Sequence, residues 1–169
     1  SSSDNDVATV SPTGVVTAKG PGYATITVKT KDNGKTDTCR VLVIQPVSSV
    51  KLNKTAGTLE VGDTYTLKAT VKPSDASNQS VKWSSSNKKV ATVSSSGKIT
   101  AVGKGTVTIT CKTVDGSKTA TCKVTVIKKV TSIKINKSSA LVYIGNTLTL
   151  KAAAYPTDAT NTNIKWYTS

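Results

Sequence analysis

Hydrophobic and polar residues alternate with a period of two along much of the chain. In Thr106-Val107-Thr108-Ile109-Thr110-Cys111, the side chains of Val107 and Ile109 share one face of an extended segment and the three threonines share the other. Such alternation predicts β-strands with one buried and one solvated face. Turn signals such as Val61-Gly62-Asp63 and Asp115-Gly116-Ser117 separate these segments, and no apolar stripe of helical length competes with them. The pattern predicts an all-β protein.

The alternating segments recur along the chain at an offset of 83 residues. Val7-Ala8-Thr9-Val10-Ser11 returns as Val90-Ala91-Thr92-Val93-Ser94. The same offset, without a gap, relates Gly14 to Gly97, Gly20 to Gly103, Cys39 to Cys122, Gly62 to Gly145, Pro73 to Pro156, and Trp83 to Trp166. Self-similarity at a fixed period indicates tandem copies of one folding unit.

The phase of the repeat divides the chain into one whole unit and two partial ones. Linker-like junctions fall at Gln45-Pro46 and at Lys128-Lys129. We therefore expect residues 47–128 to form a complete domain. Residues 1–46 match only the C-terminal half of a unit, and residues 129–169 match only the N-terminal half.

Short strands are predicted between the turn signals of the complete unit. They are Ser49–Asn53, Thr64–Lys72, Ser80–Ser85, Val90–Ser94, Ile99–Val102, Gly105–Val114 and Thr119–Ile127. About seven short strands in a unit of roughly 80 residues are typical of a two-sheet sandwich of immunoglobulin type. The predicted fold is a series of tandem immunoglobulin-like (Ig-like) β-sandwich domains.

Motifs spread along the complete unit resemble a known family. They include Leu59-Glu60-Val61-Gly62-Asp63, Ala69-Thr70-Val71-Lys72-Pro73-Ser74-Asp75-Ala76, Val81-Lys82-Trp83-Ser84-Ser85-Ser86 and Gly103-Lys104-Gly105-Thr106-Val107. The unit is similar to the bacterial Ig-like domain, group 2, the repeat of intimin- and invasin-type adhesins and of many Gram-positive surface proteins. The resemblance implies the sandwich fold and carries no catalytic residues to transfer. Because this module occurs in adhesins, wall enzymes and phage particles alike, it does not identify a ligand.

The two tryptophans of the chain, Trp83 and Trp166, are candidate site residues at equivalent positions of the repeat. Alternation places Trp83 on the same face as Val81, which predicts that the tryptophans pack in the core between the sheets. An exposed platform that stacks against sugars is the alternative.

The three cysteines leave two alternatives open. Cys111 and Cys122 lie on the two arms of a hairpin that turns at residues 115–118, in a register that places them opposite each other. A cross-strand disulfide and a pair of buried free thiols both fit this placement. Cys39, at the position equivalent to Cys122, faces Val28.

Composition excludes most kinds of chemistry. The chain has no His, which excludes Ser-His-Asp and Cys-His pairs and His-ligated metal sites. No dense run of Asp and Asn suits calcium, and Glu60 is the one glutamate. No apolar run approaches the ~18 residues that span a membrane. We expect no enzyme, no cofactor and no membrane span.

The formal net charge of +14 comes mainly from lysines spread over the whole chain, with Arg40 as the single arginine. Nucleic-acid binding favours arginine forks and interleaved aromatic residues, so no nucleic-acid partner is expected. Outward lysines on strands support solubility and block edge-to-edge pairing. Weak attraction to an anionic cell-wall polymer, a glycan or a host surface remains open.

The repeat organisation indicates a structural function. The first hypothesis is a non-catalytic stalk, spacer or adhesion segment of a secreted or cell-surface bacterial protein, whose partners are neighbouring Ig-like repeats. An alternative is a subunit of an extracellular filament, in which the half-domains of different molecules complete each other head to tail by strand complementation. A third hypothesis is a carbohydrate- or receptor-binding module of a wall enzyme or phage particle.

Overall fold

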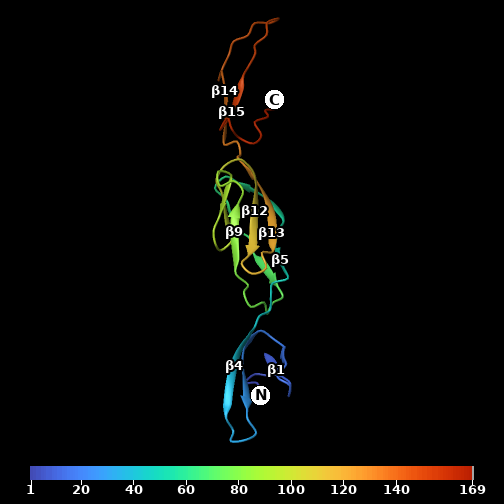
Figure 1. Cartoon of the computed structure of the whole chain (residues 1–169). Coiled ribbons are helices and arrows are strands. Elements are labelled where there is room, and N and C mark those ends of the chain that lie inside the picture. The colour runs from blue at the N-terminus through green and yellow to red at the C-terminus, as the bar shows by residue number, and fades with distance from the viewer. Residues whose placement is uncertain (169) are drawn as a thin grey trace. The chain divides into compact units, whose positions relative to one another are not determined.

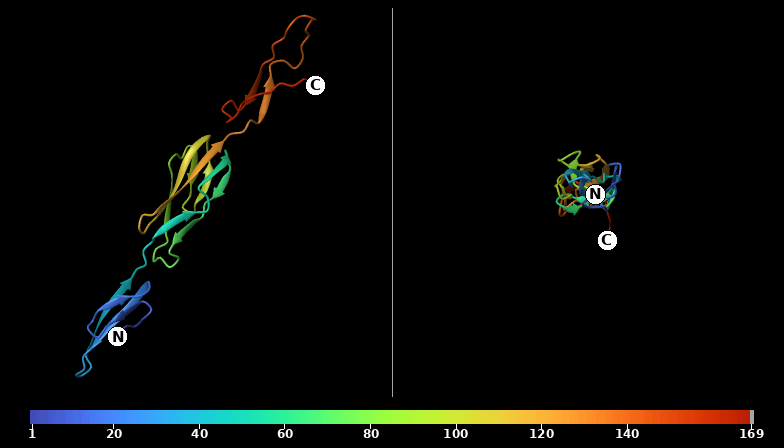
Figure 2. Two further views of the ribbon diagram at one scale, coloured as in Figure 1. Left: turned by 90° about the vertical axis from the view of Figure 1, so that its right-hand side faces the viewer. Right: turned by 60° about the horizontal axis from the view of Figure 1, so that its bottom comes forward.

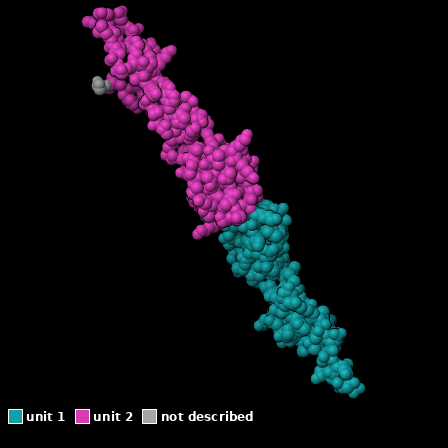
Figure 3. Space-filling model, turned by 90° about the vertical axis from the view of Figure 1, so that its left-hand side faces the viewer, with its two compact units in different colours: residues 1–53, 69–82, 111–120 teal, residues 54–68, 83–110, 121–169 magenta. Residues whose placement is uncertain are grey.

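The computed structural model describes residues 1–168. Within this range every regular element is a β-strand (Figure 1). The predicted all-β class is confirmed. The described residues pack as two compact units, coloured separately in Figure 3: one comprises residues 1–53, 69–82 and 111–120, and the other comprises residues 54–68, 83–110 and 121–168.

Two sheets form the sandwich of the central segment (Figure 1). The larger sheet has the order β6–β13–β12–β9, formed by Ala56–Glu60, Thr119–Ile127, Gly105–Thr113 and Val81–Ser85. The smaller sheet has the order β10–β11–β7, formed by Ala91–Val93, Lys98–Ala101 and Thr64–Thr66. A separate antiparallel pair consists of β5, Ser49–Leu52, and β8, Ala69–Lys72.

The core of the sandwich follows the alternation seen in the sequence. Along β12, Val107, Ile109 and Cys111 are at most 2% exposed, whereas the intervening side chains are partly or fully exposed. Ile99 of β11 is also buried, at 1% exposure. Burial of these aliphatic side chains is the main stabilising contribution to such a sandwich.

Two features of the strand pattern differ from the prediction. The single strand expected over Thr64–Lys72 is divided into β7, which pairs with β11, and β8, which pairs with β5. Between them, Leu67 is 2% exposed and donates its N–H to the carbonyl oxygen of Gly97. The sequence analysis also missed β6, which pairs in parallel with β13, from Lys123↔Ala56 to Ile127↔Glu60.

The two end segments contain strands at the positions that the repeat predicts (Figure 2). Residues 1–46 form β1, Ala8–Val10, β2, Val16–Ala18, β3, Gly22–Lys29, and β4, Thr36–Val43. Residues 129–168 form β14, Ser132–Ile135, and β15, Ala152–Tyr155. Their registers match those of the central segment at an offset of 83 residues, as in Ala8↔Ala18 and Ala91↔Ala101 or Val50↔Val71 and Ile133↔Ala154.

The hairpin turns also repeat. Asn33 and Gly34, between β3 and β4, have φ of 48° and 65°, and Gly116 and Ser117, between β12 and β13, have φ of 65° and 49°. The N–H of Thr30 donates to the carbonyl oxygen of Lys35 and that of Thr113 to Lys118, each at 2.8 Å, so each hairpin closes a loop of four residues. The positive φ angles fall on the last two residues of each loop.

Candidate functional site: the linkers between repeats

The first linker, at Gln45, is bonded through its backbone to a loop of the following repeat. The N–H of Gln45 donates to Ser77 Oγ at 2.8 Å. In return, the N–H of Ser77 donates to the carbonyl oxygen of Gln45 at 2.9 Å. Both backbone polar groups of Gln45 are therefore satisfied by one residue that lies 32 positions further along the chain.

The second linker, at Lys128, has the same pair of hydrogen bonds. The N–H of Lys128 donates to Thr160 Oγ1 at 2.7 Å, and the N–H of Thr160 donates to the carbonyl oxygen of Lys128 at 2.7 Å. Lys128 and Thr160 follow Gln45 and Ser77 by 83 residues each. We call this reciprocal pair of hydrogen bonds the linker clamp. It uses one hydroxyl side chain and three backbone groups. Because the linker residue takes part only through its backbone, Gln45 in the first linker and Lys128 in the second form the same bonds.

The loop that carries each hydroxyl is held by its own backbone. Ala76 donates its N–H to the carbonyl oxygen of Pro73 at 3.2 Å, and Ala159 donates to that of Pro156 at 3.0 Å. The side chains of both alanines are buried, at 7% and 6% exposure. A buried alanine with a bonded amide fixes the residue that follows it, which is the clamping Ser77 or Thr160.

At the first linker, the β12–β13 turn adds a further contact. Val47 is 4% exposed and donates its N–H to Asp115 Oδ2 at 2.9 Å. The turn is fixed by Thr113, whose buried Oγ1 donates to the carbonyl oxygen of Asp115 at 2.5 Å and accepts the N–H of Lys118 at 2.9 Å. Residues just after the linker are therefore held from two loops.

The second linker carries ion pairs, whereas the first has an uncharged Gln45-Pro46. Lys128 Nζ lies 2.9 Å from both carboxylate oxygens of Asp158, and Lys129 is paired with Glu60. The hydrogen bond from Lys128 lowers the pKa of the Asp158 carboxyl, and the hydrogen bond to Glu60, with its charge, raises the pKa of Lys129. All four side chains are substantially exposed, so solvent and salt screen these pairs.

The sequence analysis did not identify the clamp or the ion pairs. The signal available for the clamp was a hydroxyl residue after Ala at both Ser77 and Thr160. A hydroxyl at a fixed place in a loop has many uses, so this signal alone does not specify a partner.

The tryptophans occupy different environments. Trp83 is half-buried, and a Cβ placed on Gly97 would lie 2.9 Å from its ring, so the two residues are in close contact. Trp166 is 55% exposed among the described residues, and its core packing stays a prediction.

The structure holds all three cysteines as free thiols. Cys111 and Cys122 are buried, as expected if they are buried free thiols, and Cys39 is exposed. Burial raises the pKa of the Cys111 thiol. Burial also raises the pKa of the Cys122 thiol, and the nearby charge of Lys54 lowers that pKa by a smaller amount. The predicted register of Cys39 is wrong by two residues, because Cys39 lies opposite Ile26 and Val28 lies opposite Asp37. The pairing of Cys111 with Cys122 in a disulfide stays a prediction.

Within residues 1–168, no group of three or more His, Cys, Asp and Glu side chains could hold a metal ion. Over the same residues, no helix is long and apolar enough to cross a membrane.

Comparison with known families gives one match over most of the chain. The family model described as bacterial Ig-like domain (group 2) matches residues 1–41 and 46–124. The match spans β1–β3 and most of β4 in the first segment and nearly all of the central sandwich, and it includes the loop with Ser77.

Individual relatives differ widely in what they are. The chain is 36% identical to an Ig-like virion protein of Serratia phage KSP90, over 75% of this chain and 51% of that protein. It is 50% identical to a kappa-carrageenase of Pseudoalteromonas carrageenovora, over 43% of this chain and 18% of the enzyme. Among solved structures, domains 1–6 of the surface layer protein SbsC match 80% of this chain and 21% of that chain, at 28% identity and a TM-score of 0.46. The chain spans about half or less of the length of each.

Proposed function

Because the chain belongs to the bacterial Ig-like domain (group 2) family, we propose that it is a non-catalytic spacer of a secreted or surface-attached bacterial protein. Relatives with such different names as a virion protein and a carrageenase share this segment, which supports a role that is independent of any one chemistry. The spacer holds neighbouring parts of a longer protein at a defined separation.

The observation that carries this proposal is the occurrence of the same linker clamp twice. Unbonded short linkers between domains act as flexible joints. Here the backbone of Gln45 and that of Lys128 are each held by two reciprocal hydrogen bonds to the next repeat. Each such bond contributes about 0.5–1.5 kcal/mol net. Two bonds at one residue restrict its backbone dihedral angles, so the linker acts as a stiff joint.

The clamp is tested by Ser77→Ala, which removes the acceptor for the N–H of Gln45. Spin labels are placed on the exposed Cys39 and on a cysteine substituted for the exposed Lys88, and pulsed electron resonance measures the distance distribution between them. We expect a narrow distribution in the otherwise unaltered chain and a broader one in the variant. Amide exchange at Gln45 should rise by up to about tenfold, since one hydrogen bond is lost.

Ser74→Ala is the matched control. Ser74 lies in the same loop, is exposed, and takes part in the loop through its carbonyl oxygen, which accepts from Gln79 Nε2 at 2.6 Å. The control should leave the distance distribution narrow. A broad distribution in the chain without Ser77→Ala, or turnover of a substrate by the purified chain, would contradict the proposal.

A further inference from the structure

Two lysines lie opposite each other on the outer face of the four-stranded sheet in the complete repeat. Two backbone hydrogen bonds fix the register of β9 and β12: the N–H of Val114 donates to the carbonyl oxygen of Ser80 at 2.9 Å, and the N–H of Ser86 donates to that of Thr108 at 3.0 Å. In this register Lys82 of β9 lies opposite Lys112 of β12. Opposite residues of an antiparallel pair have Cα atoms about 5 Å apart. We call Lys82 and Lys112 the lysine pair.

Alternation directs both lysines away from the core. Lys82 is exposed between two partly buried residues of β9, and Lys112 is exposed between two residues of β12 that are at most 2% exposed. Thr119, the next outward residue across the sheet on β13, is also exposed. Most of the remaining outward positions of these strands carry hydroxyl side chains or a further lysine: Ser84, Thr106, Thr108, Thr110, Thr121, Lys123 and Thr125.

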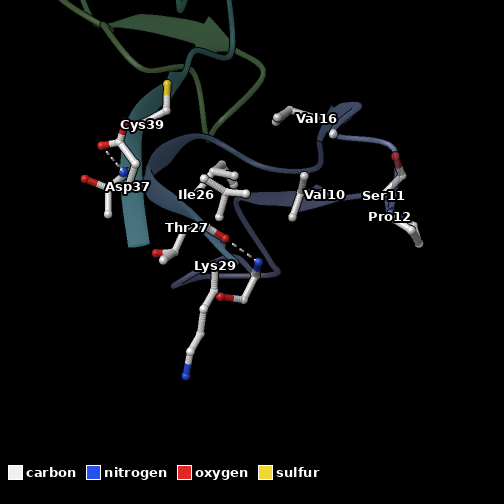
Figure 4. A pocket seen from close by; sticks show the side chains of 13 residues that line it. Val10, Ser11, Pro12, Val16, Ile26, Thr27, Lys29, Asp37 and Cys39 are labelled. Carbon is white, nitrogen blue, oxygen red and sulfur yellow. Dashed lines mark hydrogen bonds between the residues drawn. The ribbon is translucent and has the colours of Figure 1, made fainter. Parts of the chain in front are cut away.

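The positions of the lysine pair carry lysine again elsewhere in the chain. At the offset of 83 residues, Lys29 corresponds to Lys112, and Lys165 corresponds to Lys82. Lys29 is exposed on β3, and Figure 4 shows its side chain extending away from that of Ile26. Lysines that serve only solubility need to lie on the surface, but they need no fixed place opposite another cation. The recurrence therefore points to a role for the pair itself.

No acidic side chain neutralises the pair. The outward positions of β9, β12 and β13, all of which the structure describes, carry no carboxylate. Glu60, on the adjoining β6, is paired with Lys129. Neither Lys82 nor Lys112 takes part in the ion pairs found within residues 1–168. Like charges directly opposite each other on a sheet are destabilising, so an anion bound between the two ammonium groups would remove a repulsion.

We propose that this outer face binds a linear phosphodiester polymer, with one of its charged groups held between Lys82 and Lys112. A phosphodiester has two nonbridging oxygens, so a single group can accept a hydrogen bond from each lysine. Lysine, serine and threonine side chains are frequent donors to phosphate oxygens. Because the hydroxyl residues continue along the strands beyond the pair, further groups of an extended polymer meet further donors, and the weak contacts add up.

The polymer recognised in this way carries no aromatic bases. Proteins that bind single-stranded nucleic acid provide aromatic side chains on which the bases stack. The outward positions of β9, β12 and β13 have none, and Trp83 lies against Gly97 on the inner side of the sheet. A polyol phosphate chain fits this face, since it offers phosphodiesters without bases.

This contact goes beyond the spacer function proposed above and does not depend on it. The linker clamps at Gln45 and Lys128 use neither lysine. Loss of polymer binding should therefore leave the distance distribution between the spin labels unchanged, so that the two proposals are tested separately.

The test uses the full chain and a synthetic poly(glycerol phosphate) as the probe. The chain is labelled with nitrogen-15, and nuclear magnetic resonance follows its amide signals during the titration. The largest shifts should lie on β9 and β12 around the lysine pair, and the smaller sheet should change little. Affinity should fall as the salt concentration rises, because salt screens exposed charges.

A pair of double variants separates this site from attraction by net charge alone. Lys82→Gln combined with Lys112→Gln should weaken binding by at least about tenfold, since two charged hydrogen bonds to the polymer are lost. Lys88→Gln combined with Lys98→Gln is the matched control, because it removes the same charge from an exposed loop and from the exposed side of β11. The control should bind within about twofold of the unaltered chain.

Three results would overturn the proposal: no binding of poly(glycerol phosphate) by the unaltered chain, amide shifts confined to the smaller sheet, or equal loss of affinity in the two double variants. A polygalacturonate and an oligothymidylate with the same number of charges are titrated in parallel. Equal or tighter binding of either one would assign the face to a carboxylate polymer or to nucleic acid and would likewise overturn it.

Discussion

Gly97 in the complete repeat and Gly14 in the N-terminal segment have nearly the same backbone but different surroundings. Their φ angles are +81° and +86°. A Cβ on Gly97 would lie 2.6 Å from the carbonyl oxygen of Leu67 and 2.9 Å from the ring of Trp83, whereas a Cβ on Gly14 would meet nothing within 4 Å. The local sequence sets the turn at both positions. Whether a turn is also part of a packed core depends on the half of the repeat that follows or precedes it.

Gly97→Ala should produce the largest loss of stability, and this loss should exceed that of the equivalent change in the N-terminal segment. Alanine at positive φ costs about 1–2 kcal/mol, and overpacking against Leu67 and Trp83 adds about 1–3 kcal/mol. We therefore expect the free energy of unfolding of the central repeat to fall by about 2–5 kcal/mol. Urea denaturation followed by the fluorescence of Trp83 measures it.

Gly14→Ala is the matched variant for this measurement. It should produce only the cost of positive φ, about 1–2 kcal/mol, and only in the N-terminal segment. Equal shifts of the Trp83 transition in the two variants would show that the two glycines have the same surroundings, contrary to the structure.

Thr113→Val should have a smaller effect, and Thr30→Val a smaller one still. Both threonines make the same two hydrogen bonds within their turns. The hydroxyl of Thr113 donates to the carbonyl oxygen of Asp115 and accepts from the N–H of Lys118. The hydroxyl of Thr30 donates to the carbonyl oxygen of Asp32 and accepts from the N–H of Lys35. Thr113 is 2% exposed, so its loss leaves buried groups unpaired and should cost about 1–3 kcal/mol. Thr30 is exposed, so water replaces its bonds and about 0.5 kcal/mol or less is expected. Urea denaturation compares the two; an equal loss would contradict the difference in burial.

The pH dependence of the two linkers should differ slightly. The pKa of Asp158 is lowered in the folded state, so its ion pair with Lys128 stabilises the second linker above the ordinary carboxyl pKa and is lost as pH falls through the lowered value. The pKa of Lys129 is raised, so its pair with Glu60 is lost only as pH rises through that raised value. The first linker has an uncharged Gln45 in place of Lys128.

Amide exchange, corrected for its intrinsic pH dependence, measures this difference. In acid, protection of the Thr160 amide should fall relative to protection of the Ser77 amide. Lys128→Gln, which copies residue 45, should make the two amides behave alike. A parallel response of both amides in the unaltered chain would contradict a role for the ion pair.

The strands that could be predicted are those with local alternation. Residues 119–127 were predicted with the bounds that the structure has, and the other predicted strand ends differ by at most one residue, apart from Thr64–Lys72. The division of that segment into β7 and β8 could not be read from alternation, because Leu67 turns inward as the chain passes from one pairing partner to another. Strand β6 was missed because its parallel partner, β13, lies more than 60 residues away and Gly57 weakens its own strand signal.

The linker clamp was beyond prediction for a similar reason. Its hydrogen bonds join residues 32 positions apart, and both partners have ordinary loop sequences. Trp166 is 55% exposed among the described residues, and its core position in a complete repeat stays a prediction.

The amino-acid sequence by itself determined the strand class, the turn positions and the recurrence of one unit along the chain, because alternation, glycine placement and self-similarity depend on residues close together or on direct comparison of segments. The tertiary structure alone decided which apolar faces are covered, which strand edges pair and which loop holds each linker. Those outcomes depend on contacts between residues distant in the chain, and a side chain on the inner face of a strand is buried only where the opposite sheet is present to cover it.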